Sequence, residues 1–205
     1  MNVLMINGSP RGNGNTAIAL REMKNVFAQE GIEVTELNVG VKAIRGCIAC
    51  NKCAELGKCV FDDAVNEAAP LLAKADGVVV ASPVYYASAN GNLISFLDRL
   101  FYSSRCDLTM KVGASVVCAR RGGCSATFDE LNKYFTISGM PLASSQYWNS
   151  IHGRLPGEAE QDEEGKQTMR ALARNMAFLM KSITLGKEAY GLPEKEPRVA
   201  THFIR

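Results

Sequence analysis

Four cysteines lie close together in the sequence, and their spacing is the most chemically specific pattern in the chain. Cys47, Cys50, Cys53 and Cys59 are separated by gaps of two, two and five residues. Thiolates at that density commonly bind zinc, form disulfides or hold an iron–sulfur cluster. Zinc sites usually combine two CxxC pairs across a longer connection, whereas three cysteines at consecutive gaps of two are typical of clusters. The spacing favours a cluster and leaves zinc and free thiols as alternatives.

A second chemical pattern lies near the N-terminus, where residues 8–16 are rich in glycine and in polar side chains. This segment follows a short apolar run, precedes a helical pattern, and contains Gly8, Ser9, Arg11, Gly12, Asn13, Gly14, Asn15 and Thr16. Glycines let backbone N–H groups turn toward one point, and the N-terminus of the following helix adds positive potential. We therefore predict a loop that binds a phosphate group.

Two other phosphate-binding patterns fit this segment less well. Residues 12–17 match the dinucleotide pattern G-x-G-x-x-A, and Glu33 or Glu36 follows at about the spacing that such a site requires. However, Gly12 comes six residues after Ile6, too late for the tight turn that places a pyrophosphate. The Walker A pattern is absent, because no Gly-Lys-Ser/Thr follows. A terminal phosphate monoester suits the loop better.

Apolar periodicity predicts the elements that position these patterns. The expected strands are 3–6, 32–37, 78–81, 112–119 and a short one at 142–145, and the expected helices are 16–27, 62–73, 93–101, 128–137 and 163–183. Pro70 should kink or divide the second helix, and residues 82–86 should end the third strand. Strands that alternate with helices predict an α/β fold, with a doubly wound five-stranded parallel sheet and helices on both faces.

In such a sheet, ligands bind beyond the carboxyl ends of the strands. Three predicted loops lie at those ends, covering residues 8–16, 82–88 and 119–124. The cysteine insert, residues 47–59, falls between the second strand and the next helix. We therefore expect the cysteines close to the same edge of the sheet, beside any ligand bound there.

Composition limits the classes of partner and compartment. The 205 residues carry a formal net charge of +2 without a basic run, which disfavours nucleic acid and anionic membranes as partners. No signal peptide or membrane-length apolar run is visible, so we expect a cytoplasmic protein. Seven cysteines in a reducing compartment disfavour disulfides. We predict one domain over residues 1–185, followed by a tail or oligomerisation arm over 186–205.

Residues 8–16 (GSPRGNGNT) and 81–86 (ASPVYY) together resemble the flavodoxin-like NAD(P)H-dependent FMN reductases. The cysteine spacing resembles one branch of that family, the iron–sulfur flavoproteins, and the likeness covers about residues 1–185. The resemblance implies a flavodoxin-like fold that binds FMN. By the same resemblance, the FMN phosphate would be held in the first loop, around Ser9, Arg11, Asn13, Asn15 and Thr16, and the flavin ring would lie against Pro83, Val84, Tyr85 and Tyr86.

The third loop completes the expected cofactor site with Ala119, Arg120, Arg121, Gly122 and Gly123. The two glycines permit a close approach of the backbone to the flavin, and the arginines would pair with reduced flavin or with the phosphates of NAD(P)H. The alternatives are a solvated pair of arginines and a pair of tyrosines that only fills the end of the sheet.

By resemblance, the function is oxidation of NAD(P)H through FMN, because the flavin carries the chemistry and the protein supplies position and electrostatics. Electrons would pass to a quinone, a nitro or azo compound, a flavin or, through a 4Fe-4S cluster on the four cysteines, a redox protein. The alternative is a flavodoxin-like electron carrier without a small-molecule substrate. The resemblance also implies a homodimer or homotetramer.

A few single residues carry weaker indications. His152 is expected in a loop after the last strand, where it is either structural or a proton donor near the flavin. Cys106, Cys118 and Cys124 lack ligand spacing. Cys118 falls in a buried strand pattern and is interpreted as a small core residue. Cys124 lies close to the third loop, but we do not expect it to take part in redox chemistry.

Overall fold

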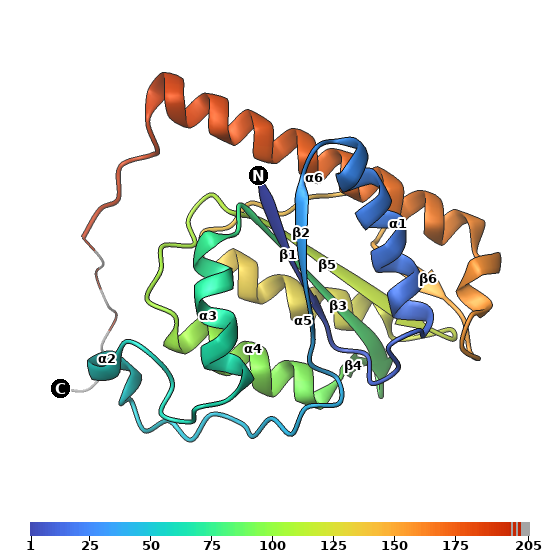
Figure 1. Ribbon diagram of the computed structural model, residues 1–205, viewed down its shortest axis with the longest axis horizontal. Helices are drawn as coiled ribbons and strands as arrows, with labels where there is room; N and C mark the ends of the chain where they lie inside the picture. Colours follow the sequence, from blue (N-terminus) through green and yellow to red (C-terminus); the bar gives the residue numbers. More distant parts are fainter. Residues whose placement is uncertain (198, 200, 202–205) are drawn as a thin grey trace.

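A mostly parallel sheet runs through the centre of the computed structural model, which describes residues 1–197, 199 and 201 (Figure 1). Its strand order is β2-β1-β3-β5-β6, and a short β4 pairs antiparallel with the end of β3. The bounds are β1 (Asn2–Asn7), β2 (Glu33–Asn38), β3 (Gly77–Tyr85), β4 (Ser88–Ala89), β5 (Val112–Ala119) and β6 (Ser150–His152). The five-stranded doubly wound sheet predicted from the sequence is confirmed.

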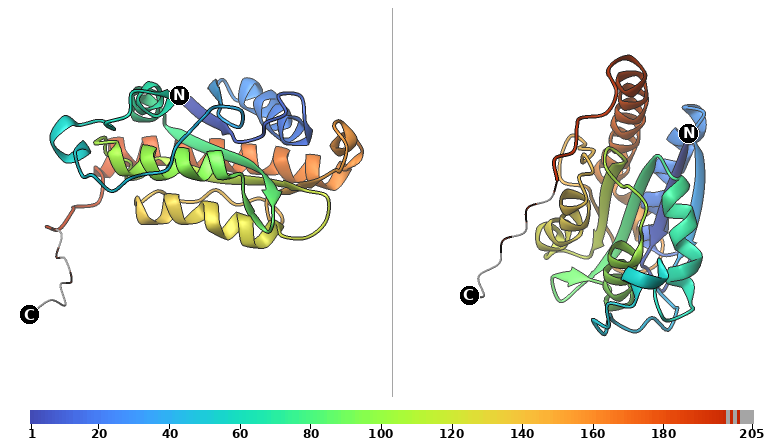
Figure 2. Two further views of the ribbon diagram at one scale, coloured as in Figure 1. Left: turned by 90° about the horizontal axis from the view of Figure 1, so that it is seen from below. Right: turned by 90° about the vertical axis from the view of Figure 1, so that its left-hand side faces the viewer.

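Helices cover both faces of this sheet, as Figures 1 and 2 show. On one face α1 (Asn15–Gln29) and α6 (Glu163–Tyr190) lie against each other and against the strands. On the other face α3 (Ala64–Lys74), α4 (Gly91–Ser103) and α5 (Cys124–Ile137) pack on the strands. Two short elements complete the fold, α2 (Cys53–Leu56) and the 3-10 helix η1 (Glu158–Gln161). The strands β1, β3 and β5 are consequently buried on both sides, which explains their continuous apolar runs.

The order of the strands reverses between β1 and β3. β1 pairs in parallel with β2 on one side and with β3 on the other. The loops after these strands therefore diverge to opposite faces of the sheet, which leaves a crevice at their carboxyl ends. This edge is where the predicted cofactor loops are brought together.

Two predictions about the strands were wrong. β3 does not end at Ala81 but continues to Tyr85, because Pro83 still pairs with β5 and the next residues pair with β4. The fifth strand lies at Ser150–His152 rather than at 142–145, so His152 is in a strand and not in a loop. The segment at Leu142 makes only one isolated bridge to the start of β5 before the chain leaves the sheet and returns.

Three predictions about the helices also need correction. α3 continues through Pro70, so of the kink or division expected there the division is wrong. α5 begins at Cys124, four residues earlier than expected, because Gly123 adopts the left-handed conformation that turns the chain directly into the helix. α6 extends to Tyr190, where Gly191 follows with a φ of 76°.

The C-terminal segment leaves α6 and returns along one side of the molecule (Figure 1). Lys195 forms an ion pair with Asp107, with 2.6 Å between Nζ and Oδ2. Phe203 and Ile204, the apolar end that the sequence suggested as an oligomerisation arm, lie outside the described residues. Among the helices of the described part, none has the length and apolar character that crossing a membrane requires.

Candidate functional site

The loop between β1 and α1 is closed by its own hydrogen bonds. The side-chain oxygen of Asn7 accepts a hydrogen bond from the amide of Ser9 at 2.9 Å, and the Ser9 hydroxyl accepts one from the amide of Arg11 at 3.2 Å. The amide of Gly14 donates to the carbonyl of Arg11 at 3.0 Å. Helix α1 begins with Gly14 at its N-cap and has no side-chain cap. The amides of its first turn therefore keep their capacity to bind an anion.

The loops after β1, β3 and β5 meet at the carboxyl edge of the sheet and line one pocket together with the segment after β6. The lining residues are Ser9, Arg11, Gly14, Asn15, Thr16, Pro83, Val84, Tyr85, Cys118, Ala119, Arg120, Gly153 and Arg154. Three of these are arginines and none is an aspartate or glutamate, so the lining favours an anionic ligand. Most of the predicted cofactor residues are thus brought together. Five of them do not belong to this lining, namely Asn13, Tyr86, Arg121, Gly122 and Gly123.

Three lining residues lie outside the three loops predicted from the sequence. Cys118 was assigned to the core, and it is 6% exposed, but it stands at the carboxyl end of β5 and reaches the pocket. Burial raises the pKa of its thiol to about 12. Gly153 and Arg154 follow β6 directly. Because the sequence placed the last strand eight residues too early, it gave no reason to bring them to this edge.

Asn15 connects the first loop to the segment after β6. Its side-chain nitrogen donates to the carbonyl of Leu155 at 2.9 Å, and its side-chain oxygen accepts from the amide of Ala159 at 3.1 Å. Gly153 packs against the side-chain amide of Asn15, since a Cβ at Gly153 would lie 2.5 Å from the Asn15 side-chain nitrogen. Asn15 therefore holds two walls of the pocket together, a role that the sequence did not suggest.

The hairpin of β3 and β4 forms another wall of the site. Its tip residues, Tyr86 and Ala87, have φ values of 52° and 60°, as a type I′ turn requires, and the Tyr86 side chain is fully exposed. Gly123 lies against this hairpin, and a Cβ on it would be 2.8 Å from Val84 and 2.9 Å from Ala87. Glu130 of α5 accepts a hydrogen bond from the β4 backbone at 2.9 Å. The second and third loops are therefore locked to each other.

His152 is held beside Cys124 at the same edge. Its Nε2 lies 3.8 Å from the Cys124 sulfur, and its Nδ1 lies 3.5 Å from the carboxylate of Asp162. The same carboxylate accepts a hydrogen bond from the His152 amide at 2.7 Å and caps α6 through the amide of Gly165. Burial raises the pKa of the Cys124 thiol. The imidazole is therefore oriented by the start of α6.

The four cysteines of the insert line a separate pocket. Cys47 and Cys50 are exposed, Cys59 is half-buried, and Cys53 is buried at the start of α2. The pocket is lined by Cys47, Ile48, Cys50, Asn51, Cys53, Cys59, Val60, Phe61, Arg99, Tyr102 and Ser103. Within the described residues, no three His, Cys, Asp or Glu side chains are arranged to hold a single metal ion. The donor chemistry of the pocket, four thiols with an apolar surround, nevertheless suits an iron–sulfur cluster.

The position of the cysteine pocket differs from the expectation. The insert leaves the sheet at its carboxyl edge but then runs below α4 and α3 to α2 (Figure 1). α4 begins at that edge, where the amide of Asn90 donates to the hydroxyl of Ser82 at 2.9 Å. The cysteine pocket contacts the second half of α4 at Arg99, Tyr102 and Ser103, about 12–18 Å along the helix axis from Gly91 by the rise per residue. None of the four cysteines lines the three-loop pocket of the same chain.

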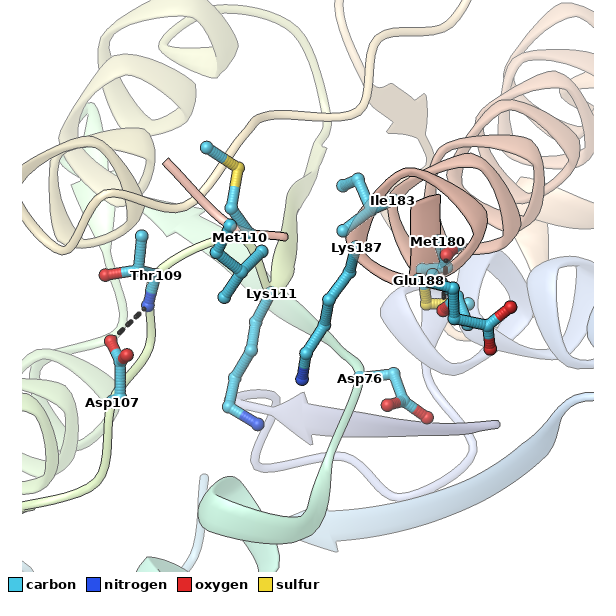
Figure 3. A pocket seen from close by; sticks show the side chains of 11 residues that line it. Asp76, Asp107, Thr109, Met110, Lys111, Met180, Ile183, Lys187 and Glu188 are labelled. Carbon is cyan, nitrogen blue, oxygen red and sulfur yellow. Dashed lines mark hydrogen bonds between the residues drawn. The ribbon is translucent and has the colours of Figure 1, made fainter. Parts of the chain in front are cut away.

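Another hollow lies at the opposite edge of the sheet, between α6 and the segment before β5 (Figure 3). Lys111 and Lys187 extend into this open space with Asp76 nearby, as the close view shows. Lys111 donates to the carbonyl of Ala73 at 2.9 Å and so caps the end of α3. Because it lies at the amino ends of β3 and β5, this hollow is separate from the cofactor loops.

The strand order and the three-loop pocket define the class of protein, a flavodoxin-like α/β protein with a binding site at the carboxyl edge of its sheet. Residues 1–154 match the model of a family described as NADPH-dependent FMN reductase. The chain belongs to this family.

Two relatives are similar to this chain over most of their length. An iron-sulfur flavoprotein of Methanocaldococcus jannaschii is 34% identical over 195 residues, which cover 89% of this chain and 99% of the relative. An iron-sulfur flavoprotein of Methanosarcina thermophila is 28% identical over 193 residues, which cover 92% of this chain and 100% of the relative. The predicted resemblance to the iron–sulfur flavoprotein branch is therefore confirmed.

Solved structures agree on the fold. RosB, solved with 8-demethyl-8-formylriboflavin-5'-phosphate, has a TM-score of 0.70 at 15% identity and matches 100% of this chain and 94% of its own. A flavodoxin from the domain Archaea has a TM-score of 0.55 at 16% identity, over 86% of this chain and 99% of its own. The flavodoxin-like fold predicted from the sequence is thus confirmed.

Proposed function

We propose that this protein is an oxidoreductase that binds FMN in the three-loop pocket, takes hydride from NAD(P)H and passes electrons to an acceptor. The observation that carries the proposal is the pocket itself, which joins an uncapped helix N-terminus to three arginines at the carboxyl edge of the sheet. Membership of the FMN reductase family supports the choice of flavin. When bound, the flavin supplies the two-electron and one-electron chemistry.

The residues of the pocket divide by chemistry. Ser9, Thr16 and the first amides of α1 would hold the phosphate, with Arg11 supplying a positive charge. The hairpin end of β3 would border the ring through Pro83, Val84 and Tyr85. Arg120 and Arg154 are the remaining cations of the lining, and they would attract the phosphates of NAD(P)H or balance the charge of the reduced ring.

We further propose that Cys47, Cys50, Cys53 and Cys59 hold a 4Fe-4S cluster. Support comes from the shared pocket of the four thiols and from the iron-sulfur names of the relatives. A cluster accepts single electrons, so it would make a redox protein an acceptor in addition to quinones, nitro or azo compounds and free flavin. All seven cysteines are free thiols, which fits a reducing compartment such as the cytoplasm.

The test is anaerobic purification, with FMN, iron and acid-labile sulfide measured per chain and EPR spectra recorded after reduction. We expect stoichiometric FMN, four iron and four sulfide, as a 4Fe-4S cluster requires. Cys50→Ser should lose iron and sulfide and retain FMN. Cys106→Ser is the control, because Cys106 lies outside the cysteine pocket. FMN without iron in the unmodified protein would reject the cluster and leave the reductase standing.

Steady-state oxidation of NADH and NADPH by the FMN-loaded protein tests the reductase. We expect turnover with a quinone acceptor. Failure with every acceptor would point instead to a flavodoxin-like electron carrier.

We also propose a homodimer or homotetramer. Phe178, Leu185 and Tyr190 are exposed apolar side chains on α6, and Trp148 is exposed beside β6. Light scattering coupled to size-exclusion chromatography would measure the mass, and a monomer would reject this assembly.

A further inference from the structure

Arg99 is a buried arginine that faces the cysteine pocket from α4. It is 1% exposed, and it is the largest of the fully buried side chains of the described part. A charged guanidinium is costly to bury unless every donor is paired. The other buried side chains of α4 are leucines, one phenylalanine and Ser103, so Arg99 is the one charged residue that this helix buries.

The guanidinium uses its donors to join the two ends of the cysteine insert. Nη1 and Nη2 donate to the two carboxylate oxygens of Asp63 at 2.7 and 2.9 Å, which is a bidentate ion pair. The carbonyls of Arg45 and Phe61 accept at 3.3 Å each. Arg45 precedes Cys47, the first cysteine of the insert, whereas Phe61 and Asp63 follow Cys59, the last one. One side chain therefore closes the loop that carries all four thiols.

Arg99 also contacts a thiol directly. Its Nε and its Nη2 each lie 3.3 Å from the sulfur of Cys59. The backbone of Cys59 is held independently, because Asn66 of α3 accepts from its amide and donates to its carbonyl, both at 3.0 Å. Cys47 and Cys50, by contrast, are exposed. Cys59 is thus the cysteine of the pocket whose sulfur is oriented by a charged donor.

An aromatic ring also packs against this arginine. The Phe61 ring lies between two cations, with the guanidinium carbon of Arg45 at 4.5 Å and that of Arg99 at 5.1 Å from its centroid. Because an arginine guanidinium stays protonated in proteins, Arg99 presents a positive charge to the Cys59 sulfur.

We propose that Arg99 is a positioning residue that fixes Cys59 as a ligand and raises the reduction potential of the group that the four cysteines hold. The inference rests on the proposed 4Fe-4S cluster. Reduction by one electron adds negative charge to the sulfurs, and hydrogen bonds or a positive charge at a sulfur stabilise that reduced form. Asp63 offsets part of the positive charge of Arg99, so the two residues together determine the net charge that acts on the reduction potential.

Two substitutions test this proposal because they should shift the reduction potential of the cluster in opposite directions. Arg99→Lys keeps the charge but loses the planar donors that reach Cys59, and the midpoint potential from an EPR-monitored titration should become more negative. Asp63→Asn leaves Arg99 with less compensation, and the potential should become more positive. Asparagine can still cap α3 in place of Asp63, which accepts from the amide of Val65 at 3.0 Å. A merely loosened loop would move both variants in the same direction.

The control is Arg105→Lys. Arg105 is exposed and donates to the carbonyl of Cys53 at 3.2 Å, so it touches the same loop without touching a sulfur. Iron, sulfide and thermal unfolding are measured for each variant. If Arg99→Lys does not fold, the sign of the shift in Asp63→Asn decides the question.

The role assigned to Arg99 would be overturned if Arg99→Lys and Asp63→Asn kept full clusters and had the same reduction potential as the Arg105→Lys control. That result would leave the cluster proposal intact. Unmodified protein that binds FMN but neither iron nor sulfide would reject the cluster proposal and, with it, this inference.

Discussion

Gly40→Ala is expected to weaken FMN binding, although residue 40 lies outside the phosphate loop. Gly40 follows β2 and packs beneath the loop backbone. A Cβ at this position would lie 2.2 Å from the carbonyl carbon of Ser9, 2.3 Å from its oxygen and 2.5 Å from the nitrogen of Pro10. These are backbone atoms, so no change of rotamer relieves the clash. Either the phosphate loop or the turn at Gly40 has to move.

The turn is held in place from its other sides. Asn92 donates to the carbonyl of Gly40 at 3.1 Å, and the amide of Val39 donates to the carbonyl of Asn7 at 2.9 Å. Displacing a packed backbone to admit one methyl group costs about 1–3 kcal/mol. If the phosphate loop takes up the movement, that cost corresponds to a rise in the Kd for FMN of roughly 5- to 150-fold.

Titration of apo-protein into FMN, followed by flavin fluorescence, measures the change, and thermal unfolding without FMN measures the stability. Gly46→Ala is the matched control, since a Cβ at Gly46 meets nothing within 4 Å. Gly46→Ala should keep the Kd for FMN and the Tm of the unmodified protein. A Gly40→Ala protein with an unchanged Kd and an unchanged Tm would refute the argument from backbone contact.

Three further results are expected. Asn15→Ala should lower the free energy of unfolding by about 1–3 kcal/mol in urea titrations, because buried partners lose hydrogen bonds; an unchanged midpoint would contradict this. Cys118 has a folded pKa of about 12 against an ordinary value near 9, so the fold stabilises its neutral thiol; that stability is present below pH 9 and is lost as pH rises toward 12. Cys118→Ala should reduce the decline in unfolding free energy above pH 9 by up to about 1.4 kcal/mol per pH unit, and equal slopes would count against it. In apo-protein, peptide mapping should find iodoacetamide on the exposed Cys47 and Cys50 long before Cys118, and the reverse order would contradict the burial described above.

Much of the fold follows from local patterns. The apolar runs of β1, β3 and β5 and the helical periodicity of α1, α4 and α6 are visible in the sequence, because burial on two faces or on one stripe repeats along the chain. The edge strand β6 was misplaced because it is too short to show such a repeating pattern. β6 has three residues, and one of them is the half-exposed His152, so its position depends on pairing with β5 rather than on its own composition.

The sequence alone determined the residue types and spacings from which the chemistry is proposed: a glycine-rich polar loop, an aromatic loop and four closely spaced cysteines. Only the tertiary structure decided how they relate. It brought Gly153 and Arg154 to the three-loop pocket, set Gly40 against Ser9, and placed the cysteines in a separate pocket beside α4. It also placed Arg99 against Cys59, 40 residues away in the chain. Contacts of this kind arise from how helices pack across the sheet, and no local pattern of residues encodes them.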